Sequence, residues 1–391
     1  MLVVDVIVIV LLVAAVVGGA TRGLVASIGM LVGLVAGGAA AYGLGPLIAG
    51  AIPLPAWRAV AVVGASIVLL AGGAALGSML GLAVRKGVDR ATPLRVVDRV
   101  LGGGVSVVIA ALVISLAGSS IATTGIPTVS PAVASSRVLR VIDALVPPPV
   151  ASGLAELRGA VLSEGLPRLG VLFSPQPETT APPVRLDDPA LTRAAASVAR
   201  ISGVAYACGM SLTGTGFVIA DDELVTNAHV VAGVTRPIVE LPGRSAVEGR
   251  VVYFDPTNDL AVIRARGLGA RPLAVTPALA AGASAVVAGY PYGGPFTMGD
   301  ARVIDRGTVS VPDIYDARDA PRDVYSLAAA VKPGNSGGPL LTADGTVAGV
   351  VFARAEDGSD RGYAMTSTVL SPVVAKAPTL TSTVSSGRCT G

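Results

Sequence analysis

Three residues that together can activate a hydroxyl nucleophile occur in order along the second half of the chain. His229 is the only histidine, so any chemistry that needs an imidazole base must use it. Asp259 stands directly before an apolar run, and Ser336 lies among glycines in Gly334-Asn335-Ser336-Gly337-Gly338. A serine hydroxyl needs a proton acceptor whose pKa is near neutrality, and a carboxylate must orient the imidazole and stabilise its charged form. The order and spacing therefore predict a Ser-His-Asp catalytic triad.

The glycines around Ser336 predict an oxyanion hole. Negative charge that develops on a substrate oxygen needs donors already in place, and the N–H groups of Gly334 and Ser336 are the candidates. Glycine suits a loop whose peptides must adopt φ values that a side chain would resist. Taken singly, the histidine could be structural, the aspartate a turn cap and the glycine-rich segment an ordinary loop. One histidine and two distant cysteines supply no ligand cluster, so we expect no metal and no cofactor.

The elements around these residues are predicted to be strands. Short apolar runs broken by turn residues at this spacing are typical of an all-β sandwich or barrel. A helix over about Pro189–Ile201 is expected to lead into this region. The predicted strands are Gly216–Ala220, Glu223–Thr226, Ile238–Leu241, Val251–Phe254, Leu260–Ala265, Ala285–Gly289 and Val347–Ala353.

The first third of the chain is apolar enough to span a membrane. The whole sequence is 52% hydrophobic and only 14% charged, with a mean hydropathy of +0.70, which excludes intrinsic disorder and a single compact aqueous domain. Long apolar runs cover about 2–20, 24–44, 59–83 and 100–121, and each is long enough for a transmembrane helix. Glycines four residues apart, at Gly29, Gly33, Gly37 and at Gly73, Gly77, Gly81, favour close helix packing within the chain or with another copy.

Charge predicts how these helices are oriented. The net charge of +3 comes from residues 1–125, which carry +4, while the remainder carries −1, so nucleic-acid binding has no support. The loop between the third and fourth apolar runs carries a cluster of basic residues, and the positive-inside rule places such a loop in the cytoplasm. Both termini and everything after about residue 122 are then extracytoplasmic. The basic residues are Arg85, Lys86, Arg90, Arg95 and Arg99.

We expect three parts: a membrane domain over 1–125, a connector over 126–185 and a catalytic domain over 186–391. Apolar spacing in the connector favours short amphipathic helices at Ser136–Leu145 and Gly153–Leu162. The proline-rich stretch Ser174–Pro183 predicts an extended linker that a protease, this one included, could cut.

Four segments make the catalytic region resemble the trypsin-like proteases of the HtrA branch. The resemblance implies two six-stranded β-barrels, with His229 and Asp259 from the first barrel, Ser336 from the second and the active site between them. It also implies that Ala330 lies at the floor of the primary specificity pocket and that Val351, Phe352 and Ala353 pair with the substrate backbone. The segments are Gly214-Thr215-Gly216-Phe217-Val218-Ile219, Thr226-Asn227-Ala228-His229-Val230-Val231, Asn258-Asp259-Leu260-Ala261-Val262 and Pro333-Gly334-Asn335-Ser336-Gly337-Gly338-Pro339.

The membrane part is similar to the colicin V production family. The matching segments are Asp5-Val6-Ile7-Val8-Ile9-Val10, Gly18-Gly19-Ala20-Thr21-Arg22-Gly23 and Asp98-Arg99-Val100-Leu101-Gly102-Gly103. Together the two parts resemble a family of actinobacterial membrane-anchored proteases that act outside the cytoplasmic membrane and support survival in acid or oxidative stress.

Two features depart from the protease pattern, and a third, the cysteine pair, agrees with a location outside the cell. Asn335 replaces the aspartate that binds a freed N-terminus in digestive proteases, so activation by that ion pair is not expected. No PDZ domain is expected after Ser336, because only 55 residues follow it. Cys208 and Cys389 are expected to form a disulfide outside the cell, with free thiols as the alternative.

The sequence thus predicts a membrane-anchored serine endopeptidase whose partners are protein or peptide substrates and membrane lipid. An uncharged, apolar residue is expected before the cleaved bond, since Ala330 offers no charge. A peptide-binding membrane scaffold without turnover is the main alternative. A transporter is disfavoured, because the apolar runs lack paired charges.

Overall fold

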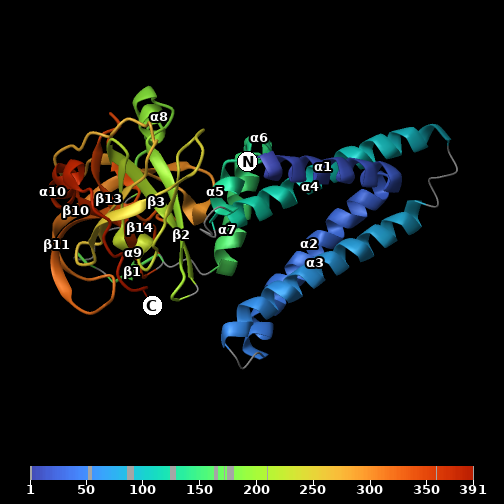
Figure 1. Cartoon of the computed structure of the whole chain (residues 1–391), viewed down its shortest axis with the longest axis horizontal. Helices are drawn as coiled ribbons and strands as arrows, with labels where there is room; N and C mark the ends of the chain where they lie inside the picture. The colour runs from blue at the N-terminus through green and yellow to red at the C-terminus, as the bar shows by residue number, and fades with distance from the viewer. Residues whose placement is uncertain are drawn as a thin grey trace. The chain divides into compact units, whose positions relative to one another are not determined.

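The computed structural model describes residues 2–51, 55–85, 92–123, 129–162, 166–170, 172–173, 180–208, 210–357 and 359–390. They form two compact units. One contains residues 2–115 and 137–142, and the other contains residues 116–136 and 143–391. Figure 1 shows the first as long helices and the second as a β-rich body.

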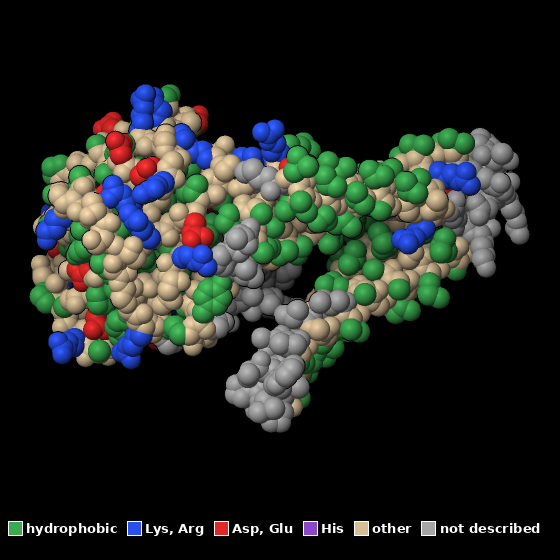
Figure 2. Space-filling view, viewed as in Figure 1, with side chains coloured by type: hydrophobic (Ala, Val, Ile, Leu, Met, Phe, Trp, Pro, Cys, Tyr) green, Lys and Arg blue, Asp and Glu red, His purple; other side chains and the backbone are tan. Residues whose placement is uncertain are grey.

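Four long helices coincide with the predicted apolar runs: α1 (Leu2–Arg22), α2 (Leu24–Ala51), α3 (Pro55–Arg85) and α4 (Thr92–Thr123). Each contains a stretch of 18 or more residues with a mean hydropathy of 2.1–3.0, which is long and apolar enough to cross a membrane. Hydrophobic side chains cover the visible faces of these helices in Figure 2, whereas charged side chains are scattered over the β-rich unit. Of the basic cluster used for orientation, Lys86 and Arg90 lie outside the described residues.

Helices α2 and α3 lie side by side (Figure 1), and glycines of both helices form the contact between them. A Cβ on Gly29 would overlap the carbonyl of Gly77, and a Cβ on Gly33 would overlap that of Gly73. The predicted role of these glycines in close packing is confirmed, and the partner helix is in the same chain. Absent side chains let the two backbones touch, which is how helices associate where apolar surface alone gives no driving force.

The predicted connector contains α5 (Val129–Ala134), α6 (Arg137–Leu145) and α7 (Pro148–Leu162). The two amphipathic helices expected here correspond to α6 and α7. Beyond them, β1 (Arg168–Leu169) pairs in parallel with β13, one of the strands of the catalytic region. Residues 174–179 of the expected linker lie outside the described residues.

The first of two seven-stranded sheets follows the order β6-β5-β2-β3-β4-β8-β7, with antiparallel neighbours. Its buried side chains, among them Ile201, Val218, Leu224 and Ile263, form one core. The strands are β2 (Val198–Ala205), β3 (Met210–Ala220), β4 (Glu223–Thr226), β5 (Ile238–Glu240), β6 (Val247–Glu248), β7 (Arg250–Asp255) and β8 (Leu260–Arg264).

The second sheet follows the order β1-β13-β12-β9-β10-β11-β14. Because β13 pairs with both β12 and β14, these strands other than β1 close into a ring. The chain then forms α10 (Ser367–Lys376) and the 3₁₀ turn η2 (Ala377–Thr379). The strands are β9 (Ser284–Gly289), β10 (Thr297–Pro312), β11 (Asp319–Ala328), β12 (Pro339–Leu341), β13 (Val347–Ala355) and β14 (Arg361–Thr366).

The helix predicted over 189–201 is wrong in its second half. Helix α8 (Pro189–Ala195) begins at Asp188, whose carboxylate accepts from Ala190 N at 2.7 Å, but it ends six residues early. The chain then turns at Ser197 and continues as β2, which pairs with β3 on one side and β5 on the other. Pairing on both edges and burial outweigh the helical spacing of the apolar residues here.

Candidate active site

His229 and Asp259 meet through two hydrogen bonds. His229 lies on α9 (Ala228–Val231), a single turn that follows β4, and Asp259 lies in the turn between β7 and β8. Asp259 Oδ2 is 2.8 Å from His229 Nδ1, and its Oδ1 accepts from the backbone N of His229 at 2.9 Å. Both residues are buried, at 8% and 2% exposure. A carboxylate held this way fixes the ring's orientation and keeps Nδ1 as the protonated nitrogen.

Asn227 contacts the backbone of Asp259, a role that its residue type alone does not predict. Asp259 has a φ of 53°, in the left-handed region that is unfavourable for most side chains. The side-chain amide of Asn227 donates to the backbone carbonyl of Asp259 at 2.8 Å. This hydrogen bond holds Asp259 in its strained conformation. In the sequence, the only sign of such a role is that Asn227 stands two residues before His229.

Thr215 connects the serine loop to the first sheet. Its hydroxyl donates to the carbonyl of Gly334 at 2.6 Å and accepts from the backbone N of Tyr290 at 3.0 Å. Its own N–H donates to the carbonyl of Ser336 at 2.8 Å. A Cβ on Gly337 would overlap Thr215 and Thr226, so the loop packs directly on β3 and β4, the strands leading to His229.

The serine loop leaves two backbone N–H groups without an acceptor among the described residues. Gly334 has a φ of +91°, and the carbonyl of the preceding Pro333 accepts from Tyr292 N at 2.6 Å. Because a trans peptide is planar, the Gly334 N–H points away from that contact. Among the described residues, neither the N–H of Gly334 nor that of Ser336 donates a hydrogen bond, so both remain available to a ligand.

The structure does not join Ser336 to His229 by a hydrogen bond. Within the described part of the chain, His229 Nε2 is buried and has no hydrogen-bond partner. The two residues nevertheless belong to adjoining segments, because Gly214 lies between the carbonyl of Ser336 and the side chain of Val230. Hydrogen bonds between catalytic groups are often long or absent before substrate binds. The missing Ser336–His229 bond is therefore compatible with a base that engages the hydroxyl when substrate binds.

The residues expected to bind substrate lie on two elements. Ala330 is exposed and lines a cavity beside the serine loop. Val351, Phe352 and Ala353 are buried on β13. Both backbone groups of Val351 already pair with the serine loop, through Gly337 N at 2.8 Å and the Gly338 carbonyl at 2.9 Å.

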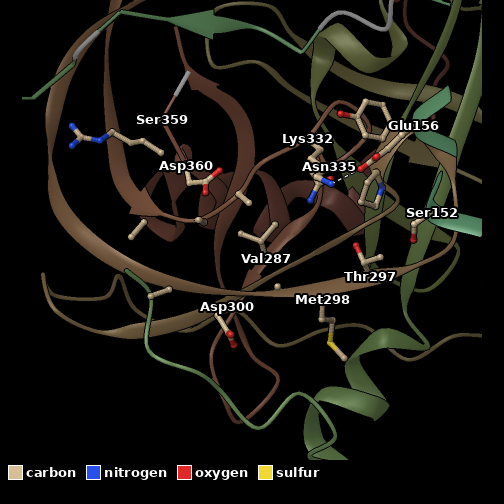
Figure 3. A pocket seen from close by; sticks show the side chains of 18 of the residues that line it. Ser152, Glu156, Val287, Thr297, Met298, Asp300, Lys332, Asn335, Ser359 and Asp360 are labelled. Atoms are coloured by element: carbon tan, nitrogen blue, oxygen red, sulfur yellow. Dashed lines mark hydrogen bonds and ion pairs between the residues drawn. The ribbon is translucent and has the colours of Figure 1, made fainter. Parts of the chain in front are cut away.

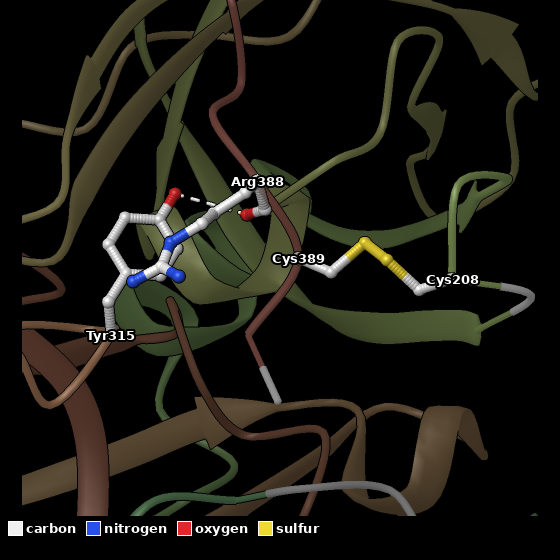
Figure 4. Close-up of a disulfide and its surroundings, with 4 residues drawn as sticks. All are labelled: Cys208, Tyr315, Arg388 and Cys389. Atoms are coloured by element: carbon white, nitrogen blue, oxygen red, sulfur yellow. Dashed lines mark hydrogen bonds between the residues drawn. A yellow bond between two sulfur atoms is a disulfide. The ribbon is translucent and has the colours of Figure 1, made fainter.

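Cys208 and Cys389 form a disulfide, with Cα atoms 6.6 Å apart (Figure 4). The C-terminal tail runs past the turn that follows α9, where Gly233 N donates to the carbonyl of Ser386 at 3.1 Å. Farther along the tail, the Arg388 guanidinium lies over the ring of Tyr315, 4.6 Å from its centroid. The disulfide therefore holds the tail beside the segment that carries His229.

Glu223 is a buried carboxylate at the end of β4 opposite to the one that leads to His229. It is 1% exposed, and within the described residues its oxygens accept no hydrogen bond; Arg264 Nε lies 3.7 Å away. Burial raises the pKa of Glu223, and the opposing effect of Arg264 is smaller.

We predict that Glu223→Gln stabilises the protein at pH 7 but not at pH 4. A raised pKa in the folded state means that ionisation costs folding free energy; the cost is absent below the unfolded pKa and is complete above the folded one. The thermal midpoint should rise by a few degrees at pH 7. Glu248→Gln, at a more exposed carboxylate on β6, is the control. A midpoint that falls equally at both pH values would contradict this prediction.

Comparisons with known proteins show two families that the chain matches. Residues 214–350 match the trypsin-like peptidase domain, and residues 4–147 match the colicin V production protein family. The chain is 36% identical to serine protease Rv3671c (MarP) of Mycobacterium tuberculosis over 79% of each protein. It is also 38% identical to the serine protease HhoB of Synechocystis over 39% of this chain and 37% of HhoB.

A solved structure extends the likeness to the fold. The crystal structure of the Rv3671c protease in its active form aligns with 56% of this chain and 98% of its own, at 37% identity and a TM-score of 0.53. The chain is a serine endopeptidase that combines a colicin V production domain with a trypsin-like peptidase domain. It belongs to the same family as Rv3671c of M. tuberculosis.

Proposed function

We propose that this chain hydrolyses peptide bonds with a triad of Ser336, His229 and Asp259. The observation that carries the proposal is the pair of hydrogen bonds from His229 to the Asp259 carboxylate beside a loop with two unengaged N–H groups. Two chymotrypsin-like barrels, built on the two sheets, would then hold the triad between them. The closed ring of the second sheet supports that organisation.

The reaction proceeds through an acyl-enzyme. Ser336 Oγ attacks the substrate carbonyl carbon while His229 Nε2 takes its proton, and the resulting oxyanion binds to the N–H groups of Gly334 and Ser336. The tetrahedral intermediate collapses as the imidazolium protonates the leaving amine. A water then attacks the acyl group, with His229 again as base, and the acid product leaves. Asp259 orients the imidazole and stabilises its charged form in both steps.

The four apolar helices support a multi-pass anchor in the cytoplasmic membrane, with lipid as their surroundings. We place the catalytic region and both termini outside that membrane, by the charge argument above. The disulfide is consistent with an oxidising compartment. By likeness to its family, the protein would serve resistance to acid and oxidative stress. Its proline-rich connector, an extended segment, would be one of its own substrates.

The proposal is tested by covalent labelling of the full chain in detergent with a fluorophosphonate. We expect stoichiometric labelling of the parent chain and none of Ser336→Ala, together with hydrolysis of an unfolded protein by the parent only. A chain that binds peptides, does not cleave them and does not react with the fluorophosphonate would instead be the peptide-binding scaffold.

The proposed specificity has its own measurement. Ala330 at the pocket floor, with Phe352 and Ala353 pairing with the substrate backbone, favours an uncharged apolar side chain before the cleaved bond. A peptide library cleaved by the full chain should show that preference by about tenfold over Lys and Arg. A profile dominated by basic residues would overturn it.

A further inference from the structure

The loop that carries Gly334 and Ser336 packs on β3 and β4 on one side and borders a cavity on another. The cavity has a volume of about 800 Å³, and its walls include Ala330, Lys332 and Asn335 of the loop (Figure 3). Groups beside a void lose packing contacts on that side. The loop therefore depends on hydrogen bonds and neighbouring segments to keep its peptides aligned.

Asn335 does not supply that support. It is 4% exposed, and in the described part of the chain its Oδ1 accepts no hydrogen bond. A neutral amide also cannot form the ion pair that an aspartate makes at this place in digestive proteases. The loop must be held by other segments.

The turn η1 (Pro291–Gly293) holds the peptide between Pro333 and Gly334, whose N–H is one of the two oxyanion donors we propose. Tyr292, at a φ of 54°, donates its N–H to the carbonyl of Pro333, and this contact sets the direction of the Gly334 N–H. On its other side η1 is anchored to the first sheet, where Arg200 Nη1 donates to the carbonyl of Gly293 at 2.8 Å. Arg200 in turn pairs with Glu240 at 2.7 Å.

Helix α7 contacts both η1 and the serine loop through one turn. Ala155 is 6% exposed and packs so closely on Gly294 that a Cβ on that glycine would overlap the Ala155 methyl group. The next residue, Glu156, binds Lys332 Nζ at 2.6 Å, and that ammonium lies 6.0 Å from the centroid of the Tyr292 ring (Figure 3). Both ends of the Tyr292–Pro333 contact are therefore braced by α7.

We propose that α7 is a positioning element for the oxyanion hole, acting through Ala155 on η1 and through Glu156 on Lys332. The proposal rests on the proposed peptidase function. Helix α7 belongs to the connector. Through these contacts, the position of the connector would affect the rate of the chemical step. Its contacts hold the Gly334 N–H in line with the N–H of Ser336.

Three variants of the full chain test the proposal. Ala155→Leu drives α7 off Gly294, and we expect kcat to fall about tenfold with KM unchanged, less than the 10²–10³ of losing one donor entirely. Glu156→Gln keeps the shape of the side chain and should lower kcat about threefold. Gly153→Leu is the matched control, because Gly153 has open space around it, and should leave kcat unchanged.

A peptide aldehyde provides a second readout, since its adduct with Ser336 places an oxyanion in the hole. Its affinity should fall in step with kcat in Ala155→Leu and Glu156→Gln. Unchanged kcat in both variants would overturn the proposal, and so would a change in KM alone, which would make α7 part of the substrate groove. If Ala155→Leu does not fold, Glu156→Gln decides. A parent chain that fails to label with fluorophosphonate would instead refute the peptidase function.

Discussion

Asp259→Asn should lower kcat about 10⁴-fold while leaving the fold intact. The carboxylate accepts from both Nδ1 and the backbone N of His229. An amide in its place presents its NH₂ group to one of these donors, which favours the tautomer that is protonated on Nε2. That nitrogen then cannot take the proton of Ser336. The measurement is steady-state cleavage of a peptide ester or amide by the full chain, with KM followed separately.

Asp255→Asn is the matched control for that substitution. Asp255 ends β7 four residues earlier, and its carboxylate accepts from the backbone N–H groups of Thr257 and Asn258, both at 3.0 Å. An asparagine oxygen can keep these two backbone contacts. Its NH₂ group replaces Oδ2, which accepts from Tyr253 Oη and Asn258 Nδ2 and makes no contact with His229, so kcat should change by no more than about threefold. A triad role for Asp259 would be contradicted if its variant kept a tenth or more of the parent kcat.

Loss of the Cys208–Cys389 bond should be the largest single effect on stability. The two residues are 181 positions apart, and closing a loop of that size restricts the unfolded chain by about 5 kcal/mol on the entropy model, an upper figure. For a region of this size the thermal midpoint should fall by roughly 10–20 °C. Because the tail lies beside α9, Ser336 labelling should be lost at that lower temperature too.

The test compares Cys208→Ser, Cys389→Ser and the double variant by the temperature at which fluorophosphonate labelling is lost. All three should behave alike, since each removes the same bond. Reduction of the parent chain should reproduce the effect. Two reactive thiols in the native, unreduced protein would rule the bond out.

The sequence predicts those parts of the protein that have a strong local pattern. Apolar runs predict α1 to α4, and glycines four residues apart predict the α2–α3 contact. Seven strands are found near their expected places, because alternating apolar residues between turns are typical of half-buried strands. Strand β2 is mistaken for the end of a helix, since its helical spacing is overridden by pairing with β3 and β5.

For the site, residue chemistry predicts which groups would react but not which residues would hold them in place. His229 is unique, and the serine loop has a distinctive composition. Thr215, Asn227 and Tyr292 act through hydrogen bonds between segments far apart in the chain, and their residue types are common in turns and strands. Nothing in a local pattern reports such a contact, so these residues could be found only in three dimensions.

The pairing of β1 with β13 has a consequence for a nicked chain. Arg354 N donates to the carbonyl of Pro167 at 3.1 Å, Glu356 N to that of Leu169 at 3.0 Å, and Tyr363 Oη to that of Gly170 at 3.2 Å. A cut between Gly170 and Val184 would break the covalent link but leave these bonds in place. Cleavage and release would then be two separate events, and the severed halves would remain together as a two-chain species until β1 and α7 both dissociate.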